Sequence, residues 1–508
     1  MPFRRSRTPE VRPALNARYI PLPSKPPSQL KDWQALNHDV GEAILVEIRK
    51  AQEHAKKSKI SSHDSLYTGV SGIAFMEYHL AGMRIPLHSE ILAPKKLLAI
   101  ADKNLARVLR HNPINMEYMY SPSRLSFLET NIGVAVLVII RGLVTTEQTI
   151  VDNWHPARDY LEYALRQTLA ADADAYSPGD KEDGCEVLYG RAGMLYALLY
   201  LRKALDQAQV IPDMSETVLA SLQVLTSDDT IQRLVDSIVT RGQHGGHVLA
   251  SEFRAEDAKR LPPLMWSWRG KRYLGGAHGV AGILQILLRC PISIISKHIP
   301  NIFKTISWLM EIQGDDGNWS AKCPNQSGIS SDSELVQWCH GATGIVILFS
   351  TAIGFLKTHE QFFKIDHTTV EKLRGSLQLG AEVVYRQGLL KKGVGLCHGV
   401  AGSVYALLAA SDALDGTSSS FLAPVSAMQD LPSHINRCKH FARAAHLAFL
   451  AKFHNDKVLL PDMGEPDHPF SLYEGLSGAC CAWAEIVCRM DTKDPRRAIS
   501  GMPGYDDL

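Results

Sequence analysis

The chain has 508 residues, of which 45% are hydrophobic and 21% are charged, as is ordinary for a soluble protein with a large core. Its formal net charge of +1 excludes a global electrostatic attraction to nucleic acid or to acidic lipid. The longest apolar runs, such as 134–140, are far shorter than the roughly 20 apolar residues that a membrane-spanning helix needs.

The first 27 residues contain five arginines and seven prolines, and no apolar segment typical of a secretory signal follows them. We expect residues 1–30 to form a disordered basic arm and residues 31–508 to form a single domain. A weak targeting role, with peripheral contact at the plasma membrane, is the alternative to a solvated tail. The nine cysteines are odd in number and scattered, which argues against a disulfide framework and favours the reducing cytoplasm.

A glycine motif, G-x-x-G followed by an apolar stretch, recurs along the chain with a spacing of mostly about 60 residues. Its seven copies are 69–72, 130–133, 190–193, 279–282, 341–344, 399–402 and 475–478. In the second copy Thr130 replaces the first glycine. One such motif in an apolar helix is usually a packing device, but seven ordered copies indicate a repeated structural unit.

The apolar stretch after each motif is hydrophobic nearly all round, which is typical of a helix buried on every side. Between the motifs lie amphipathic stretches such as 31–55, 157–170 and 370–385, which we expect to form outer helices. Seven outer–inner helix pairs that need neighbours to bury the inner helix predict an all-α fold, a closed α/α toroid. The long spacer at 243–273 reads as an elaborated surface loop.

Two copies of the motif are preceded by a Cys-His dipeptide, in Trp338-Cys339-His340-Gly341 and in Leu396-Cys397-His398-Gly399. Equivalent points of a closed repeat can converge, so Cys339, Cys397 and His398 are candidate zinc ligands. Two thiolates and one imidazole would leave a fourth position open, as in catalytic zinc sites. His340 is a rival ligand, because a symmetric site with two cysteines and two histidines would be closed and structural.

His278 stands in its repeat where His340 and His398 stand in theirs, but it has no neighbouring cysteine. A histidine in that position is better suited to proton transfer than to metal ligation. The alternative is a histidine that only caps the following helix.

At these residues the chain resembles the lanthionine synthetase C-like (LanC-like) family, eukaryotic type. The resemblance extends roughly over 66–488 and includes Ala277-His278-Gly279 and Leu472-Tyr473-Glu474-Gly475. It implies an α/α toroid of seven inner and seven outer helices with one zinc ion at one end of the barrel. Bacterial members add a peptide cysteine thiol to dehydroalanine or dehydrobutyrine, and eukaryotic members add glutathione to such residues in damaged proteins.

By position, the resemblance makes Cys339, Cys397 and His398 the zinc ligands and His278 the residue that handles the proton. Lys392 matches a lysine that eukaryotic members use for glutathione, and its alternative is a solvated loop lysine. Glu186 matches an acidic residue of the bacterial cyclases, which positions the electrophile or only caps the inner helix. The segment 463–467 lacks the arginine of animal relatives, a departure that bears on glutathione as the thiol donor. Ser403 stands where relatives commonly have asparagine.

The resemblance, together with the candidate ligands, therefore implies a zinc-dependent transferase that joins glutathione, or a thiol peptide, to a dehydroamino acid in a peptide or protein. A second hypothesis is a binding protein without turnover, in which zinc is structural and the cavity binds glutathione or a peptide. A third is a glycoside hydrolase, which needs two opposed carboxylates. The pairs Glu182-Asp183 and Asp315-Asp316 are available for it but look like turn or solvated acids.

Overall fold

The computed structural model describes residues 17–23, 33–83, 85–114, 124–170, 184–207, 216–324, 334–362, 366–415, 439–490 and 500–508. These ranges are almost entirely helices, turns and loops. Their extended pairing is limited to the isolated bridges Tyr19–Leu390, Trp268–Lys271 and Tyr273–Lys322. No helix in the described ranges combines the length and the apolar character that a membrane span requires.

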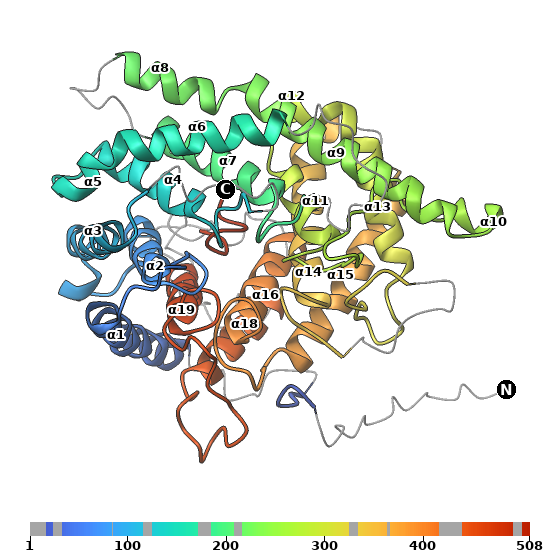
Figure 1. Ribbon diagram of the computed structural model, residues 1–508. Coiled ribbons are helices and arrows are strands. Elements are labelled where there is room, and N and C mark those ends of the chain that lie inside the picture. Colours follow the sequence, from blue (N-terminus) through green and yellow to red (C-terminus); the bar gives the residue numbers. More distant parts are fainter. Residues whose placement is uncertain are drawn as a thin grey trace.

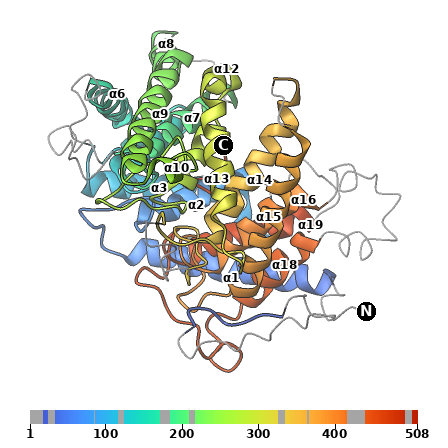
Figure 2. The ribbon, with the colours of Figure 1, turned by 90° about the vertical axis from the view of Figure 1, so that its right-hand side faces the viewer.

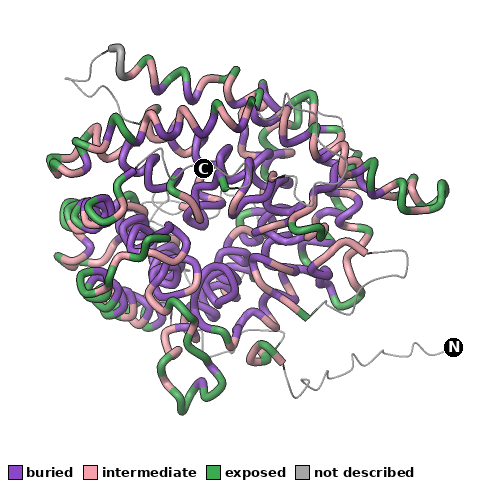
Figure 3. Tube along the Cα trace, in the orientation of Figure 1, coloured by how far each residue is buried: buried purple, intermediate pink, exposed green. Residues whose placement is uncertain are grey.

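Each of the seven motifs leads directly into a helix whose residues are buried on nearly every side (Figure 3). In α11, for example, all residues from Val280 to Leu288 are buried. The seven inner helices are α2 (Val70–Met83), α4 (Asn131–Gly142), α7 (Arg191–Gln207), α11 (Val280–Leu288), α14 (Ala342–Thr358), α16 (Val400–Leu414) and α19 (Leu476–Met490).

Seven amphipathic helices surround this inner ring, each with an apolar stripe that faces inward (Figures 1 and 2). They are α1 (Trp33–Lys57), α3 (Pro94–His111), α6 (Trp154–Ala170), α9 (Asp228–Ser251), α13 (Ile299–Glu311), α15 (His367–Gln387) and α18 (Lys439–Ala451). Helix α2 packs on α3, α4 on α6, α14 on α15 and α16 on α18. Helix α1 packs on α19, so the first outer helix covers the last inner helix and the ring closes. The predicted all-α toroid of seven inner and seven outer helices is confirmed.

Short helices decorate the ring: α5 (Gln148–Asp152), α8 (Glu216–Leu225), α10 (Ala255–Ala258), α12 (Ile292–Ile295), and the 3₁₀ turns η2 (Glu90–Leu92), η4 (Ser296–His298) and η5 (Glu360–Phe362). Part of the spacer predicted to be a surface loop is helical, because α9 continues to Ser251. Two glycines of α9 let the segment around Met265 and Trp266 approach the helix closely. A Cβ on Gly245 would lie 2.1 Å from the carbonyl oxygen of Met265, and one on Gly242 would lie 2.4 Å from the ring of Trp266.

The second glycine of every motif is explained by one close contact. A Cβ at this position would lie only 1.9–2.5 Å from the carbonyl oxygen six residues earlier in the chain, for which no side chain leaves room. The seven pairs of glycine and carbonyl residue are 72 and 66, 133 and 127, 193 and 187, 282 and 276, 344 and 338, 402 and 396, and 478 and 472. In the second repeat Thr130 replaces the first glycine and caps α4, since its hydroxyl accepts a hydrogen bond from the amide of Ile132.

Backbone hydrogen bonds join the seven loops that precede the inner helices into a closed ring. Each neighbouring pair of loops shares one N–H to carbonyl bond of 2.6–3.4 Å. The donor and acceptor pairs are 67 to 128, 125 to 189, 187 to 277, 276 to 338, 339 to 397, 397 to 473, and 473 back to 67. This ring fixes the end of the toroid at which the candidate site residues lie.

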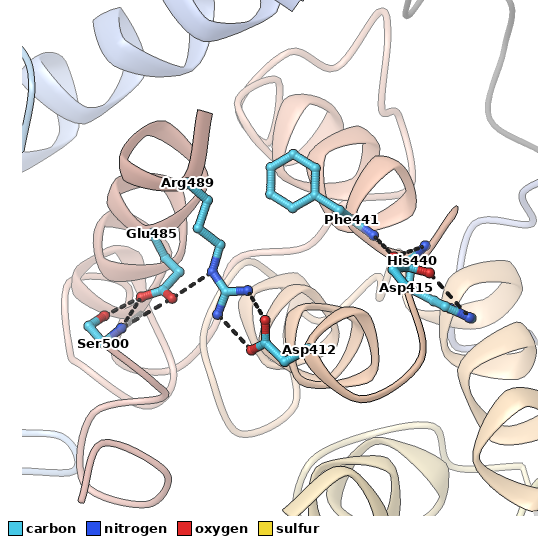
Figure 4. A network of polar contacts seen from close by, with 7 residues as sticks. All are labelled: Asp412, Asp415, His440, Phe441, Glu485, Arg489 and Ser500. Atoms are coloured by element: carbon cyan, nitrogen blue, oxygen red, sulfur yellow. Dashed lines mark hydrogen bonds and ion pairs between the residues drawn. The ribbon is translucent and has the colours of Figure 1, made fainter. Parts of the chain in front are cut away.

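Residues 500–508 fill the centre of the toroid (Figure 1). The hydroxyl of Tyr473 donates to the carbonyl of Pro503 at 2.9 Å, and the hydroxyl of Tyr196 donates to the carboxylate of Asp507 at 2.7 Å. The amide of Ser500 donates to Glu485 of α19, which also accepts from Arg489 at 2.8 Å, and Arg489 bonds Asp412 of α16 (Figure 4). The tail is therefore part of the core.

Residues 17–23 of the segment predicted to be a disordered arm lie against the loop between α15 and α16. The amide of Ile20 donates to the carbonyl of Leu389 at 2.8 Å, and the amide of Lys391 donates to the carbonyl of Arg18 at 3.0 Å. These backbone bonds give the short stretch a fixed place at that loop. Residues 1–16 and 24–32 lie outside the described residues.

We expect Gly133→Ala to lower the midpoint of thermal unfolding strongly, because its Cβ would lie 1.9 Å from the carbonyl oxygen of Phe127. The matched control is Gly375→Ala in the exposed face of α15, where a Cβ meets nothing within 4 Å. That change should raise stability by about 0.5–1 kcal/mol through helix propensity. Equal midpoints for the two variants in a thermal melt would contradict the steric explanation of the repeat.

Glu77 of α2 is fully buried and accepts hydrogen bonds from Gln52 at 3.1 Å and Asn104 at 3.2 Å. Burial raises the pKa of Glu77 to about 8. The folded protein then keeps a proton that the unfolded chain loses near pH 4.5, so this group costs stability that grows as the pH rises towards 8. In melts from pH 5 to pH 8, Glu77→Gln should gain stability steadily relative to the wild type. A constant difference would show that Glu77 is ionised in the fold.

Candidate metal centre

Cys339 and Cys397 lie in the loops that lead into α14 and α16, and His398 lies directly before Gly399, the N-cap of α16. One ligand atom from each of the three side chains lies within 4.8 Å of the others. The amide of Cys339 donates to the carbonyl of Cys397 at 3.4 Å. The ring of loop hydrogen bonds thus brings together two cysteines that are 58 residues apart in the sequence.

The chemistry of these donors fits zinc. Cys339, Cys397 and His398 are exposed by only 8%, 3% and 9%. Burial, and then the neighbouring thiol of Cys339, raise the pKa of Cys397 well above its ordinary value, so a bound cation is what would favour its thiolate. The Nε2 atom of His398 is buried without a hydrogen-bond partner. Two buried sulfurs and an imidazole suit a borderline-soft metal such as zinc.

His340 lies apart from the three clustered ligand atoms. Its ring is 5.2 Å from that of Tyr273 and 6.4 Å from that of His278, centroid to centroid. Burial, followed by the nearby His278 and Lys322, lowers the pKa of His340 to about 4. This placement favours the open three-ligand site over the symmetric four-ligand alternative.

His278 is paired with Glu186, a contact that the sequence did not predict. Nδ1 of His278 lies 2.9 Å from Oε2 of Glu186, whose carboxylate also accepts from the amides of Leu188 at 2.9 Å and Tyr189 at 2.6 Å. Complete burial of Glu186 raises its pKa, while His278 and the two amides act in the opposite direction. Glu186 therefore caps the turn before α7 and orients His278 at the same time.

The indole of Trp268 stacks on His278, with ring centroids 3.8 Å apart and an angle of 3° between the planes. Trp268 comes from the spacer between α10 and α11, outside the repeated motif. Sequence reasoning missed this residue because nothing in a spacer indicates what it covers.

Lys392 is exposed on the loop between α15 and α16, five residues before Cys397. Its neighbour Lys391 pairs with Asp462 at 3.0 Å. Lys392 therefore lies on the exposed part of the loop that supplies two of the candidate ligands, Cys397 and His398. A cation at this place can attract an anionic substrate.

Of the acids considered for glycoside hydrolysis, the pair that the structure describes does not join this site. Asp315 and Asp316 are exposed in the turn after α13, where Asp316 accepts from the amide of Asn318 at 3.0 Å. Glu182 and Asp183 lie outside the described residues.

One position of the repeat supplies a set of polar and aromatic side chains. The residue directly before the first glycine is Thr68, Glu129, Tyr189, His278, His340, His398 or Glu474 in the seven copies. Burial, together with Glu474 and Glu186, raises the pKa of Glu129 to about 7. Glu129 and Glu474 were missed as site residues, although alignment of the seven motifs would have indicated both.

The fold and this site define a class of protein, an α/α toroid with a cysteine- and histidine-lined centre at the end where the inner helices begin. The family model for lanthionine synthetase C-like proteins matches residues 61–496. The chain therefore belongs to the LanC-like family.

Two relatives extend this comparison. The chain is 30% identical over 363 residues to the LanC-like protein GCL1 of Arabidopsis thaliana, covering 70% of this chain and 68% of that protein. It is 28% identical over 318 residues to the Glutathione S-transferase LANCL1 of Danio rerio, covering 61% of each chain.

We expect the purified protein to contain one zinc ion per chain and Cys397→Ala to lose it, as measured by elemental analysis. His340→Ala should keep the metal, since its ring lies towards His278 and Tyr273. Cys290→Ala, which removes a buried thiol just beyond the C-terminal end of α11, is the control and should also keep it. Loss of zinc in His340→Ala would instead support the symmetric site, in which His340 is a fourth ligand.

Proposed function

We propose that this protein catalyses the zinc-dependent addition of a thiol, foremost that of glutathione, to dehydroalanine or dehydrobutyrine residues of peptides or proteins. The observation that carries the proposal is the meeting of Cys339, Cys397 and His398 within 4.8 Å, at the same end of the toroid as the pair His278 and Glu186. Such a site combines a place for a thiol-activating metal with a proton donor. The similarity to a relative named Glutathione S-transferase LANCL1 supports glutathione as the donor.

The proposed metal ligands are Cys339, Cys397 and His398, which leave one position for the incoming thiol. Zinc bound there would supply Lewis acidity that deprotonates a coordinated thiol near neutral pH. The burial of the two cysteines excludes water from one side of the centre, which strengthens electrostatic interactions within it. The proton released from the thiol passes to solvent.

The new bond forms between the sulfur and the β-carbon of the dehydroamino acid, and the electron pair of the double bond moves onto the α-carbon and the adjoining carbonyl. We propose that His278 then donates a proton to the α-carbon. Because Nδ1 is bonded to Glu186, Nε2 is the atom available for this transfer. The Glu186 carboxylate stabilises the imidazolium before the donation and holds the ring in one orientation.

Lys392 and the loop that holds it are proposed to bind a carboxylate of the thiol donor. The segment 463–467 borders this loop, since the amide of Gly464 donates to the carbonyl of Lys391 at 2.6 Å. Without an arginine in that segment, Lys391 and Lys392 are the cations that the loop between α15 and α16 contributes to this edge. We further propose that the protein acts in a reducing compartment such as the cytoplasm, where its described cysteines, all unpaired by disulfides, would persist as thiols.

We expect His278→Ala to lower kcat for glutathione addition to a dehydroalanine peptide by about 10²–10⁴-fold, the range for loss of a general acid. Its zinc content should stay at the wild-type level, because His278 is outside the ligand cluster. Product formation measured by mass spectrometry, beside elemental analysis of the same sample, tests both statements. A His278→Ala enzyme that turns over normally would disprove the assigned role.

Glu186→Gln should lower kcat by about 10²-fold through loss of the negative charge beside His278, with the fold retained. The amide can still accept a hydrogen bond but cannot stabilise the imidazolium.

If the unmodified protein binds zinc but shows no turnover with several thiols and dehydroamino acids, that result would favour the binding-protein hypothesis instead.

A further inference from the structure

His278 is held from two directions by residues of different segments. Glu186 contacts the edge of the imidazole, with 2.9 Å between Oε2 and Nδ1. Trp268 covers one face, with ring centroids 3.8 Å apart and planes 3° from parallel. Three other aromatic rings approach His278 less closely, since the ring centroids of Tyr273, Tyr189 and His340 lie at 6.0 Å, 6.1 Å and 6.4 Å. Trp268 is therefore the close face contact of the ring.

A tight turn presents Trp268 to the site. Trp268 and Lys271 exchange two backbone hydrogen bonds of 2.9 and 3.0 Å, with Arg269 and Gly270 between them. Arg269 has φ +49° and Gly270 has φ +67°, values that both central residues of a type I′ hairpin turn adopt. In the described part of the chain Arg269 is the one non-glycine residue with positive φ.

The left-handed backbone of Arg269 costs about 1 kcal/mol and persists where surrounding contacts impose it. The guanidinium of Arg269 lies 4.6 Å from the centroid of the Trp268 ring, a cation–π contact that offsets part of this cost. The strain is thus stored directly beside the side chain that stacks on His278. A strained turn next to a proposed proton donor indicates that the position of the indole is functionally constrained.

The edge contact alone does not fix the plane of the imidazole. Small changes in χ1 and χ2 can tilt the ring while Nδ1 stays near Glu186, and such a tilt moves Nε2 out of line with the substrate. A flat ring 3.8 Å away opposes this tilt, because a tilted imidazole would collide with it. The two contacts together fix both the tautomer and the plane of the ring.

We propose that Trp268 is a positioning residue that aligns Nε2 of His278 for proton transfer to the α-carbon. This inference rests on the proposed function, in which His278 is the proton donor. A displacement of a reacting group by about 1 Å can cost about 10²-fold in rate. The indole is therefore expected to act on kcat, while the thiol and the metal bind elsewhere in the site.

The test compares Trp268→Ala, Trp268→Leu and Trp268→Phe in glutathione addition to a dehydroalanine peptide. Ala and Leu should lower kcat by about 10–10²-fold with unchanged KM for glutathione and one zinc per chain. Phe keeps a flat face and should restore a rate close to that of the wild type. Leu fills most of the space without a flat ring, so it keeps the comparison informative if Ala fails to fold.

The decisive arm is a double-variant cycle with His278→Ala. If Trp268 acts through His278, Trp268→Ala should cause no further loss in the His278→Ala background. Equal losses in both backgrounds would overturn the inference and make Trp268 a structural residue. Wild-type rates for both Trp268→Ala and Trp268→Leu would also overturn the inference. Normal turnover by His278→Ala alone would instead overturn the proposed function.

Discussion

The closed ring of backbone hydrogen bonds between the seven loops is the constraint on which the rest of the structure depends. It joins each loop to the next and ends with the amide of Tyr473 on the carbonyl of Tyr67, which connects the last repeat to the first. The second glycine of each motif serves this ring, because only the absence of a Cβ lets the helix begin so close to the carbonyl of its own loop. Main-chain bonds do not depend on side-chain identity. Each loop can therefore carry a different functional residue without a change in the frame.

The repeat accordingly places unlike chemistry at equivalent positions. Three successive copies put His278, His340 and His398 before the glycine, and only the last two add a cysteine one residue earlier. In the proposed function, that single difference separates the position of the proton donor from the positions of the metal ligands. Two of the remaining copies contribute Glu129 and Glu474. Burial, and then the charges of Glu474 and Glu186, raise the pKa of Glu129 to about 7.

The toroid and its candidate ligands could be predicted because they follow from the motif itself. The glycines indicate where the backbone leaves no room for a side chain, and the apolar runs indicate which helices are buried. His278 and His398 precede the first glycine of their motifs, which indicates equivalent places in the fold. The other features arise from segments outside the repeat. Trp268 reaches His278 from a spacer, residues 500–508 fill the centre, and residues 17–23 pair beside Lys391. No periodic pattern indicates where such segments pack, and the spacer was itself misjudged where α9 continues to Ser251.

His340 occupies the copy of the repeat between the proposed proton donor and the last of the proposed metal ligands. It stands between His278 and His398 in the repeat, and its ring lies 6.4 Å from that of His278. Because its pKa is lowered to about 4, mainly by burial, it is neutral at physiological pH. A neutral imidazole there adds no positive charge of its own beside His278, the proposed proton donor, or beside Cys339, the neighbouring proposed metal ligand.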